Sequence, residues 1–369
     1  MRVLAIHMNP GKTANACQIY RANTPFYYLN QQPHWDARWI SWEDVREAYH
    51  QQGRSVFVRL LADYDLFVLP RVAAPHPMVE RSLLALIEGI RTSGKRWVYE
   101  IDDDYTNQHR DLTSMGVIKA MDVARLADAI TVTTPYLAEV MQRETKRPVY
   151  VLPNMVAPLY WNQPSRRTED PNALTVTLGG SVTHEHDWKV LSEVMPSILA
   201  NDYGRKVTFR VIGYHPDYLR NLPNTEYLPP LDYELYAEII RQSDVILAPV
   251  DTADRFNDGK SPIKVIEGMA ASRLRGEIPT GAACIASNNK VYQLAIESGK
   301  NGILCSHTPE AWYNAIDSVL RNDTLRHQIQ DAGHRWVWKR HDMSRTWQLW
   351  ASAYQKILSK PANSKALTL

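Results

Sequence analysis

The stretch "PLYWNQPSRRTEDPNALTVTLGGS", residues 158–181, decides the fold that we expect for this chain of 369 residues. Residues 158–172 are polar, contain prolines and lack helical or strand periodicity, whereas 174–179 is an apolar run of strand length. An aperiodic segment followed by a new strand predicts a linker and the start of a second domain. The length of the chain also favours about two domains.

Short apolar runs alternate with amphipathic segments of helical length, such as 78–94 and 186–201, on both sides of this linker. This alternation is typical of parallel α/β layers, so we predict two doubly wound, Rossmann-like domains. They span 1–157 and 173–335, with helices and a tail over 336–369. The predicted strands are 2–8, 65–70, 96–101, 129–133, 149–153, 174–179, 207–213, 244–250 and 283–287.

The composition excludes several classes of protein. Lys+Arg total 42 and Asp+Glu 40, which leaves a formal net charge of +2 and no overall basic field for nucleic acid or anionic membrane. The three cysteines, Cys17, Cys284 and Cys305, are odd in number and far apart, which favours buried thiols in a reducing compartment. No run approaches the roughly 18 apolar residues of a membrane span, so we expect a cytoplasmic protein without integral membrane association.

In doubly wound domains, ligands bind at the carboxyl ends of strands. Gly11, Lys12 and Thr13 follow the first predicted strand, where their backbone N–H groups could hold a phosphate or carboxylate. A plain turn is an equal alternative, because the glycines of a P-loop or a dinucleotide fingerprint are absent.

Three carboxylates, Asp102, Asp103 and Asp104, follow the strand predicted over 96–101. Adjacent carboxylates repel one another, so a cation, a polyol substrate or solvent must share their charge. We favour a functional role over a solvated loop that caps a helix. The spacing of Asp102 and Asp104 also matches a metal-binding D-x-D string, which is common by chance.

The strand 174–179 continues into "GGSVTHEHDW" (179–188). The two glycines allow the backbone to approach a ligand closely. Two histidines and Asp187 then gather at the start of a helix, where Asp187 would complement the helix dipole. Hydrogen bonding to a sugar or phosphate is favoured over zinc, because no further ligands occur at zinc spacing.

The stretch "RFNDGKSPIKVIEGMA" (255–270) predicts a buried helix with Ser261 as its N-cap. Lys260 and Lys264 lie at its positive end, an arrangement that becomes favourable when an anion such as a diphosphate docks there. Glu267 lies one turn beyond Lys264, and a surface salt bridge between them is the alternative interpretation.

These residues resemble the GT-B glycosyltransferases, in particular the retaining family 4, also described as glycosyl transferases group 1. The similar strings follow the family's order along nearly the whole chain. They are "YEIDDD" (99–104), "ADAITVTTPYLAEVM" (127–141), "VLPN" (151–154), "LGGSVTHEHDW" (178–188), "KSPIKVIEGMA" (260–270), "CIAS" (284–287), "NGILC" (301–305) and the closing "WQLWASAYQKIL" (347–358).

The resemblance implies two Rossmann-like domains facing across a cleft, with C-terminal helices that cross back to the first. The second domain would bind a nucleoside-diphosphate sugar and the first an acceptor. Transfer would retain the anomeric configuration, with no obligatory metal or other cofactor. No protein base is obligatory either, because the departing phosphate can take the acceptor's proton.

We expect roles for individual residues from their places at strand ends and, for Ser261, Ile263, Lys264 and Glu267, also from the resemblance. Asp102, Asp103 and His184 are expected to position the sugar or acceptor in catalysis, and Gly11, Lys12, Thr13 and Asp104 to bind the acceptor. The expected donor-binding residues are Gly180, Ser181, Asp258, Lys260, Ser261, Ile263, Lys264 and Glu267.

Two positions depart from the family pattern. The acid that usually lies eight residues before Glu267 is replaced by Gly259, for which Asp258 is a possible substitute. The Arg and Lys that usually follow the second domain's first strand correspond to Ser181 and His186. The diphosphate must therefore meet its positive charge elsewhere.

Two alternatives remain open: a metal-dependent D-x-D glycosyltransferase and a non-catalytic GT-B-like protein that binds nucleotide or glycan. The acceptor is a glycan, a small molecule or a modified nucleic-acid base. The sequence does not distinguish among these.

Overall fold

A computed structural model describes residues 1–7, 16–53, 55–71, 77–104, 106, 120–163, 170 and 172–360. The chain forms two compact units. Unit 1 comprises Met1–Asn154, Gly259–Ser261 and Met343–Leu369, and unit 2 comprises Met155–Asp258 and Pro262–Asp342.

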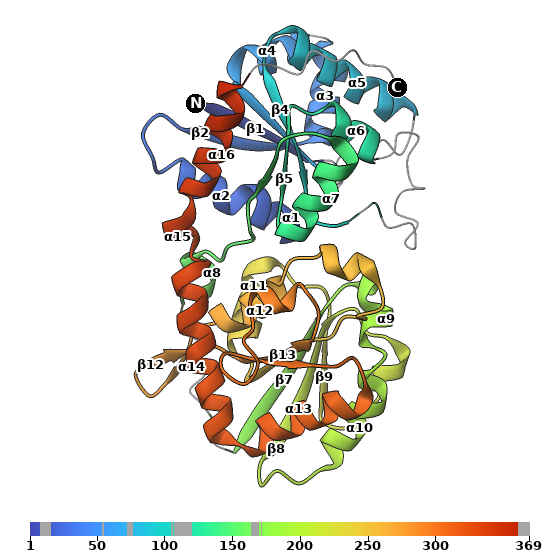
Figure 1. Cartoon of the computed structure of the whole chain (residues 1–369), viewed down its shortest axis with the longest axis vertical. Coiled ribbons are helices and arrows are strands. Elements are labelled where there is room, and N and C mark those ends of the chain that lie inside the picture. Colours follow the sequence, from blue (N-terminus) through green and yellow to red (C-terminus); the bar gives the residue numbers. More distant parts are fainter. Residues whose placement is uncertain are drawn as a thin grey trace. The chain divides into compact units, whose positions relative to one another are not determined.

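Unit 1 is built on a six-stranded parallel sheet in the order β2-β1-β3-β4-β5-β6 (Figure 1). Its strands are β1 (Arg2–His7), β2 (Asp36–Ser41), β3 (Leu66–Pro70), β4 (Arg96–Ile101), β5 (Ala129–Val132) and β6 (Val149–Val151). Its helices include α1 (Ala16–Gln18), α2 (Thr24–Leu29), α3 (Trp42–Gln52), α4 (Ser55–Asp63), α5 (Pro77–Thr92), α6 (Ala120–Leu126), α7 (Pro135–Thr145), α15 (Met343–Thr346) and α16 (Gln348–Ser359).

Unit 2 repeats the plan with a parallel sheet in the order β14-β13-β10-β7-β8-β9. Its strands are β7 (Ala173–Gly180), β8 (Lys206–Gly213), β9 (Thr225–Leu228), β10 (Val245–Ala248), β13 (Ala283–Ser287) and β14 (Ile303–Cys305), with a separate hairpin of β11 (Arg273–Arg275) and β12 (Ile278–Thr280). Its helices include α8 (Pro158–Trp161), α9 (Glu185–Trp188), α10 (Leu191–Ala200), α11 (Tyr233–Arg241), α12 (Ile263–Ala270), α13 (Pro309–Arg321) and α14 (Asp323–Arg340).

Strand β10 shows how the unit 2 sheet is covered on both faces. Val245 and Leu247 belong to one apolar cluster, which also contains residues of α10 and α13. Ile246 and Ala248 point the other way, into a second cluster formed with α12. Because successive side chains of a strand alternate between faces, a strand buried on both sides is apolar throughout. The expected α/β class with two parallel Rossmann-like sheets is confirmed.

Helix α12 begins later than the sequence predicts. Its N-cap is Pro262, and no side chain caps the helix. The expected cap, Ser261, instead accepts a hydrogen bond from Asn154 Nδ2 at 2.8 Å. The prediction that Ser261 caps this helix is therefore wrong, because a contact within unit 1 engages its hydroxyl.

The last helix, α16, packs into unit 1. Trp350 and Tyr354 are buried, and the Arg21 guanidinium lies over the Trp350 ring at 5.7 Å from its centroid. Trp347 and Leu358, which follow the same spacing of three and four residues along this segment, are half-buried. The aromatic side chains of α16 thus serve packing.

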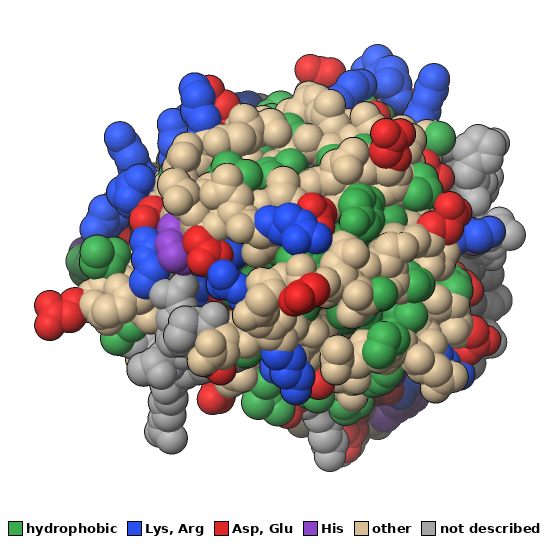
Figure 2. Space-filling view, turned by 90° about the horizontal axis from the view of Figure 1, so that it is seen from below, with side chains coloured by type: hydrophobic (Ala, Val, Ile, Leu, Met, Phe, Trp, Pro, Cys, Tyr) green, Lys and Arg blue, Asp and Glu red, His purple; other side chains and the backbone are tan. Residues whose placement is uncertain are grey.

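Among the described residues, no helix is both long and apolar enough to cross a membrane. The face in Figure 2 carries basic and acidic side chains interspersed with apolar ones. Charges of both signs on this face agree with the small net charge of +2.

Candidate functional site

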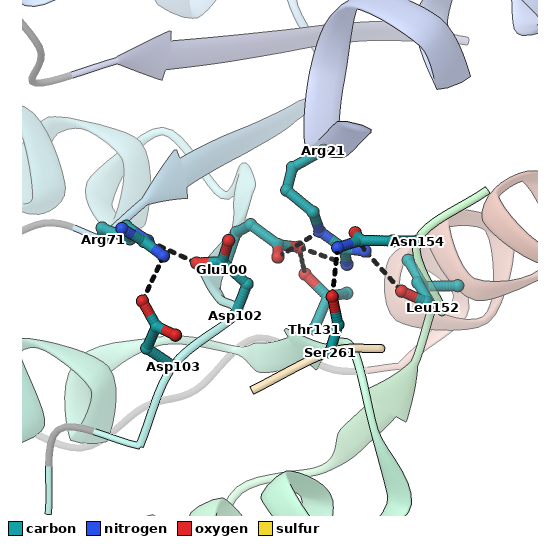
Figure 3. A network of polar contacts seen from close by, with 9 residues as sticks. All are labelled: Arg21, Arg71, Glu100, Asp102, Asp103, Thr131, Leu152, Asn154 and Ser261. Atoms are coloured by element: carbon teal, nitrogen blue, oxygen red, sulfur yellow. Dashed lines mark hydrogen bonds and ion pairs between the residues drawn. The ribbon is translucent and has the colours of Figure 1, made fainter. Parts of the chain in front are cut away.

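The carboxyl ends of β3 and β4 in unit 1 carry the predicted acidic cluster (Figure 3). Arg71 lies between two of the acids: it pairs with Asp102 through Nε and with Asp103 through Nη2, the latter at 2.5 Å. The Arg71 backbone has a φ of 50°, a left-handed conformation that is costly for a side-chain-bearing residue. Through these two ion pairs, the Arg71 guanidinium offsets the repulsion between the carboxylates of Asp102 and Asp103.

Burial alone would raise the pKa of Asp102. Arg71 outweighs that effect, with a contribution from the Cys17 thiol, and the pKa of Asp102 lies below its usual value. Burial and the negative charge of Asp102 raise the pKa of the Cys17 thiol. Asp102 is thus an ionised carboxylate beside an unreactive thiol.

A second, fully buried network lies beside the first (Figure 3). Arg21 binds both Glu100 carboxylate oxygens, at 2.7 and 3.2 Å, and donates to Asn154 Oδ1 at 3.0 Å. Burial disfavours the charge of Arg21, but Glu100 outweighs burial and raises the pKa of Arg21. Asn154 continues the network to Ser261, so Ser261 is held by unit 1.

Asp104 is separate from the Arg71 cluster. Its Oδ1 accepts hydrogen bonds from the backbone N–H and hydroxyl of Thr106, at 2.9 and 2.5 Å. Gly259 lies against its backbone: a Cβ at position 259 would be 2.4 Å from Asp104 Cβ and 2.9 Å from Asp104 N. No side chain fits at 259 without displacing Asp104, which gives the missing family acid a steric reason.

In unit 2, three predicted residues meet at the carboxyl end of β7. A Cβ built on Gly180 would lie 2.8 Å from His184 Cδ2 and 3.0 Å from Lys264 Nζ. Lys264 also donates to the Gly179 carbonyl oxygen. Glycine at 180 therefore lets an imidazole and an ammonium group approach the same point of the backbone.

Two neighbouring side chains, Asp187 and Trp188, fix the orientation of the His184 imidazole. Its Nδ1 lies 2.8 Å from Asp187 Oδ2, and its ring stacks on Trp188 with an interplanar angle of 3°. Asp187 is completely buried, and its Oδ1 accepts from the Asp251 backbone N–H and Asn257 Nδ2, both at 2.8 Å. Asp187 is thus more than a helix-terminal charge, because it connects two loops and orients His184.

Glu267 is buried on α12, which does not fit the alternative of a surface salt bridge. Its Oε2 accepts a hydrogen bond from the Tyr236 hydroxyl at 3.0 Å. Burial, with the nearby Glu267 charge, raises the pKa of Tyr236 well above its usual value, so this phenol remains a donor. Tyr236 also lies beside Gly179, at ordinary contact distance from a Cβ built there.

The other predicted residues are less closely gathered. The exposed Ser181 hydroxyl lies 2.8 Å from Thr183 Oγ1, and Asp258 pairs with Lys290 at 3.7 Å. Lys260 belongs to unit 1, whereas Ile263 is half-buried in the first turn of α12. Gly11, Lys12 and Thr13 lie outside the described residues.

Sequence reasoning missed Arg71, Arg21, Tyr236 and Asn257. Arg71 follows β3 directly, and a cation after a strand end was a usable signal. Tyr236 and Asn257 gave none, because only the tertiary fold brings them to Glu267 and Asp187. Among the described residues, no group of three or more His, Cys, Asp or Glu side chains could hold a metal ion.

Comparisons with known proteins agree with this architecture. Residues 173–322 match the family described as glycosyl transferases group 1, and no curated protein matches the chain. The structure is similar to that of Anabaena HepE in complex with UDP-glucose, at 12% identity and a TM-score of 0.67 over 96% of this chain and 100% of that one.

Two further structures have a similar fold, each at 14% identity over 97% of this chain. They are the sucrose-phosphate synthase of Thermosynechococcus elongatus, with a TM-score of 0.62 over 100% of its chain, and a glycosyltransferase from Rickettsia africae, with a TM-score of 0.65 over 99% of its chain. The fold is therefore the GT-B fold of these proteins.

Proposed function

We propose that this protein is a glycosyltransferase that transfers a sugar from a nucleoside-diphosphate sugar to an acceptor hydroxyl. The main support is the meeting of His184 and Lys264 at Gly180, with the buried Glu267 one turn beyond Lys264. These residues lie within the segment that matches the glycosyl transferases of group 1. The UDP and UDP-glucose complexes of HepE, a protein of similar fold, agree with such a donor.

The chemistry of sugar transfer explains why cations belong here. Breaking the bond between sugar and phosphate develops negative charge on the departing diphosphate, and fixed positive groups aimed at it lower the barrier. Lys264 supplies such a group next to the start of α12. Glu267 would accept hydrogen bonds from the ribose hydroxyls, with its carboxylate oriented by Tyr236.

In the proposed reaction, unit 1 binds the acceptor at the carboxyl end of β4. Asp102 and Asp103 offer carboxylate oxygens to hydroxyl groups, while Arg71 keeps them ionised and apart. The acceptor oxygen attacks the anomeric carbon from the side of the leaving group, so the transfer retains the anomeric configuration, and the departing phosphate takes the acceptor's proton. No protein base is then required, and Lys264 rather than a metal ion meets the charge that develops on the diphosphate.

The test begins with a donor. Thermal-shift assays with UDP, GDP, ADP and their sugar conjugates would identify the nucleotide, and hydrolysis or transfer of the matching donor would then be followed by NMR, which also reports the product anomer. We expect a retained anomer, and a loss of turnover of at least about a hundredfold in Lys264→Ala.

Glu267→Ala should weaken the binding of nucleotide sugars more than that of inorganic diphosphate. Lys300→Ala, which removes an exposed lysine of the same unit that pairs with Glu297, is the matched control and should remain active. Nucleotide binding without any turnover would instead support the non-catalytic alternative, and no binding at all would refute the proposal.

A further inference from the structure

The donor side of the proposed reaction has one feature that Lys264 and Glu267 do not explain. His184 sits against Gly180 on a carboxylate, Asp187, that is fully removed from water. A buried carboxylate is costly unless a cation or several donors compensate it. The Asp187 Oδ1 atom accepts hydrogen bonds from two neutral donors, Asn257 Nδ2 and the Asp251 backbone N–H, and its Oδ2 atom lies 2.8 Å from the Nδ1 atom of His184.

This arrangement favours a charged ring. An opposite charge within hydrogen-bond distance favours the protonated form of a histidine, and the two neutral donors keep Asp187 ionised. In the protonated form both ring nitrogens carry hydrogens, so Nδ1 can donate to Asp187 while Nε2 donates elsewhere. The Cδ2 atom of the ring, which is bonded to Nε2, lies against Gly180, and the Lys264 ammonium group lies near the same point of the backbone.

We propose that Asp187 and Asn257 hold His184 as an imidazolium that binds the donor diphosphate together with Lys264. The inference rests on the proposed function. It adds that part of the positive charge at the diphosphate site comes from His184, whose charge depends on pH, whereas that of a lysine or arginine would not in this range. Asp187 and Asn257 are positioning residues in this arrangement, since they act on the ligand through His184.

Other charged groups near His184 favour or oppose the protonation of its ring. Lys264 opposes protonation of the ring, whereas Asp187 and, from α9, Glu185 favour it. His307 also titrates in this field: burial lowers its pKa, and Asp251 and Asp187 oppose that shift. A proton on His184 is present at low pH and lost as pH rises, so affinity for a diphosphate falls with rising pH.

UDP is the probe for the first measurement, with its dissociation constant recorded from pH 6 to pH 9. Its terminal phosphate itself titrates near pH 6, so His184→Gln supplies the baseline. We expect the affinity of the wild type to fall about tenfold more than that of His184→Gln over this range, the worth of one charge-assisted hydrogen bond. His215→Gln, which changes a histidine of unit 2 that contacts the Leu228 carbonyl oxygen instead, should behave as the wild type.

The second measurement observes the ring directly, by NMR titration of the histidines without nucleotide. Asp187→Asn removes the carboxylate but keeps the shape, and it should move the His184 titration to lower pH. Asn257→Ala removes a hydrogen bond to Asp187 and makes no change at His184 itself, so a shift of the His184 titration in this variant would show that Asn257 acts through Asp187. Glu185→Gln, on the same helix, is the matched control and should move it less.

Identical pH dependence of UDP binding in the wild type and His184→Gln would overturn this inference and leave the proposed function standing. An identical His184 titration in the wild type and Asp187→Asn would overturn it as well. A wild type that binds none of UDP, GDP and ADP at any pH would instead refute the proposed function, and with it the ligand named here.

Discussion

Gly259 shows how a single residue departs from a family pattern for a steric reason. The resemblance noted in the sequence leads us to expect an acid at this position. Here the space that a side chain would need is filled by the backbone and Cβ of Asp104, and Asp258 pairs with Lys290. The loss of the family acid therefore goes together with a close approach of two backbone segments within unit 1.

Gly259→Ala tests this packing. The added Cβ meets backbone atoms that cannot rotate away, so we expect the free energy of unfolding in urea to fall by about 1–3 kcal/mol. Gly89→Ala is the matched control: its Cβ would meet only Leu61 Cδ1, at 3.1 Å and at the end of a flexible side chain. Because alanine is the better helix former, that variant should be as stable as the wild type or more so. Equal stability of Gly259→Ala and the wild type would contradict the packing argument.

At the scale of elements, all nine predicted strands are present, whereas β2, β9, β14 and the two hairpin strands β11 and β12 were missed. β2, β9 and β14 each lie at the edge of a sheet. β2, β9 and β11 contain charged residues and so lack the apolar run that marks a strand buried on both faces, and β12 and β14 are only three residues long. The predicted helix 186–201 is likewise two helices, α9 and α10, because the chain turns at Lys189 and Val190.

The residues of the candidate site also fall into those that the sequence predicts and those that it does not. Gly180, His184 and Lys264 were predictable because each lies at a strand end or a helix start, where parallel sheets collect ligands. Their supports Asn257 and Tyr236 were not, since a hydrogen bond across some 70 or 30 residues leaves no local pattern. The wrong prediction for Ser261 has the same cause. Its hydroxyl accepts a hydrogen bond from Asn154, which is distant in sequence, and it does not cap the helix as the local sequence predicts.

Helix α16 offers a test of how a C-terminal element is attached to unit 1. Trp350 is fully buried and contacts the Arg21 guanidinium, so Trp350→Ala should lower the free energy of unfolding by about 3–5 kcal/mol. The neighbouring Leu349 is 44% exposed, and Leu349→Ala should change stability by less than about 0.5 kcal/mol. Urea unfolding of both variants measures the difference, and similar values for the two would show that α16 is not held by its buried face.

At the scale of the whole molecule, the predicted site residues are mainly acidic in unit 1 and mainly basic at Gly180 in unit 2. In unit 1 the carboxylates of Asp102 and Asp103 already have a cation in Arg71. In unit 2 the groups that meet at Gly180 are basic, with Asp187 behind His184. A metal ion bound at Asp102 would have to displace Arg71, whereas in the proposed reaction Lys264 and His184 supply the positive charge for the diphosphate.

This distribution predicts that turnover, once a donor is found, persists in EDTA at the rate measured in added Mg²⁺ or Mn²⁺. The physical reason is that fixed cations of the protein, rather than a divalent ion, stabilise the departing diphosphate. Asp104→Asn makes the test specific: it removes the second acid of the D-x-D string, and in a metal-free reaction it should leave the activity in EDTA and in Mn²⁺ equal to one another. Activity that disappears in EDTA and returns with Mn²⁺ would overturn the charge assignment and favour the metal-dependent alternative, in which Asp102 must exchange Arg71 for the ion.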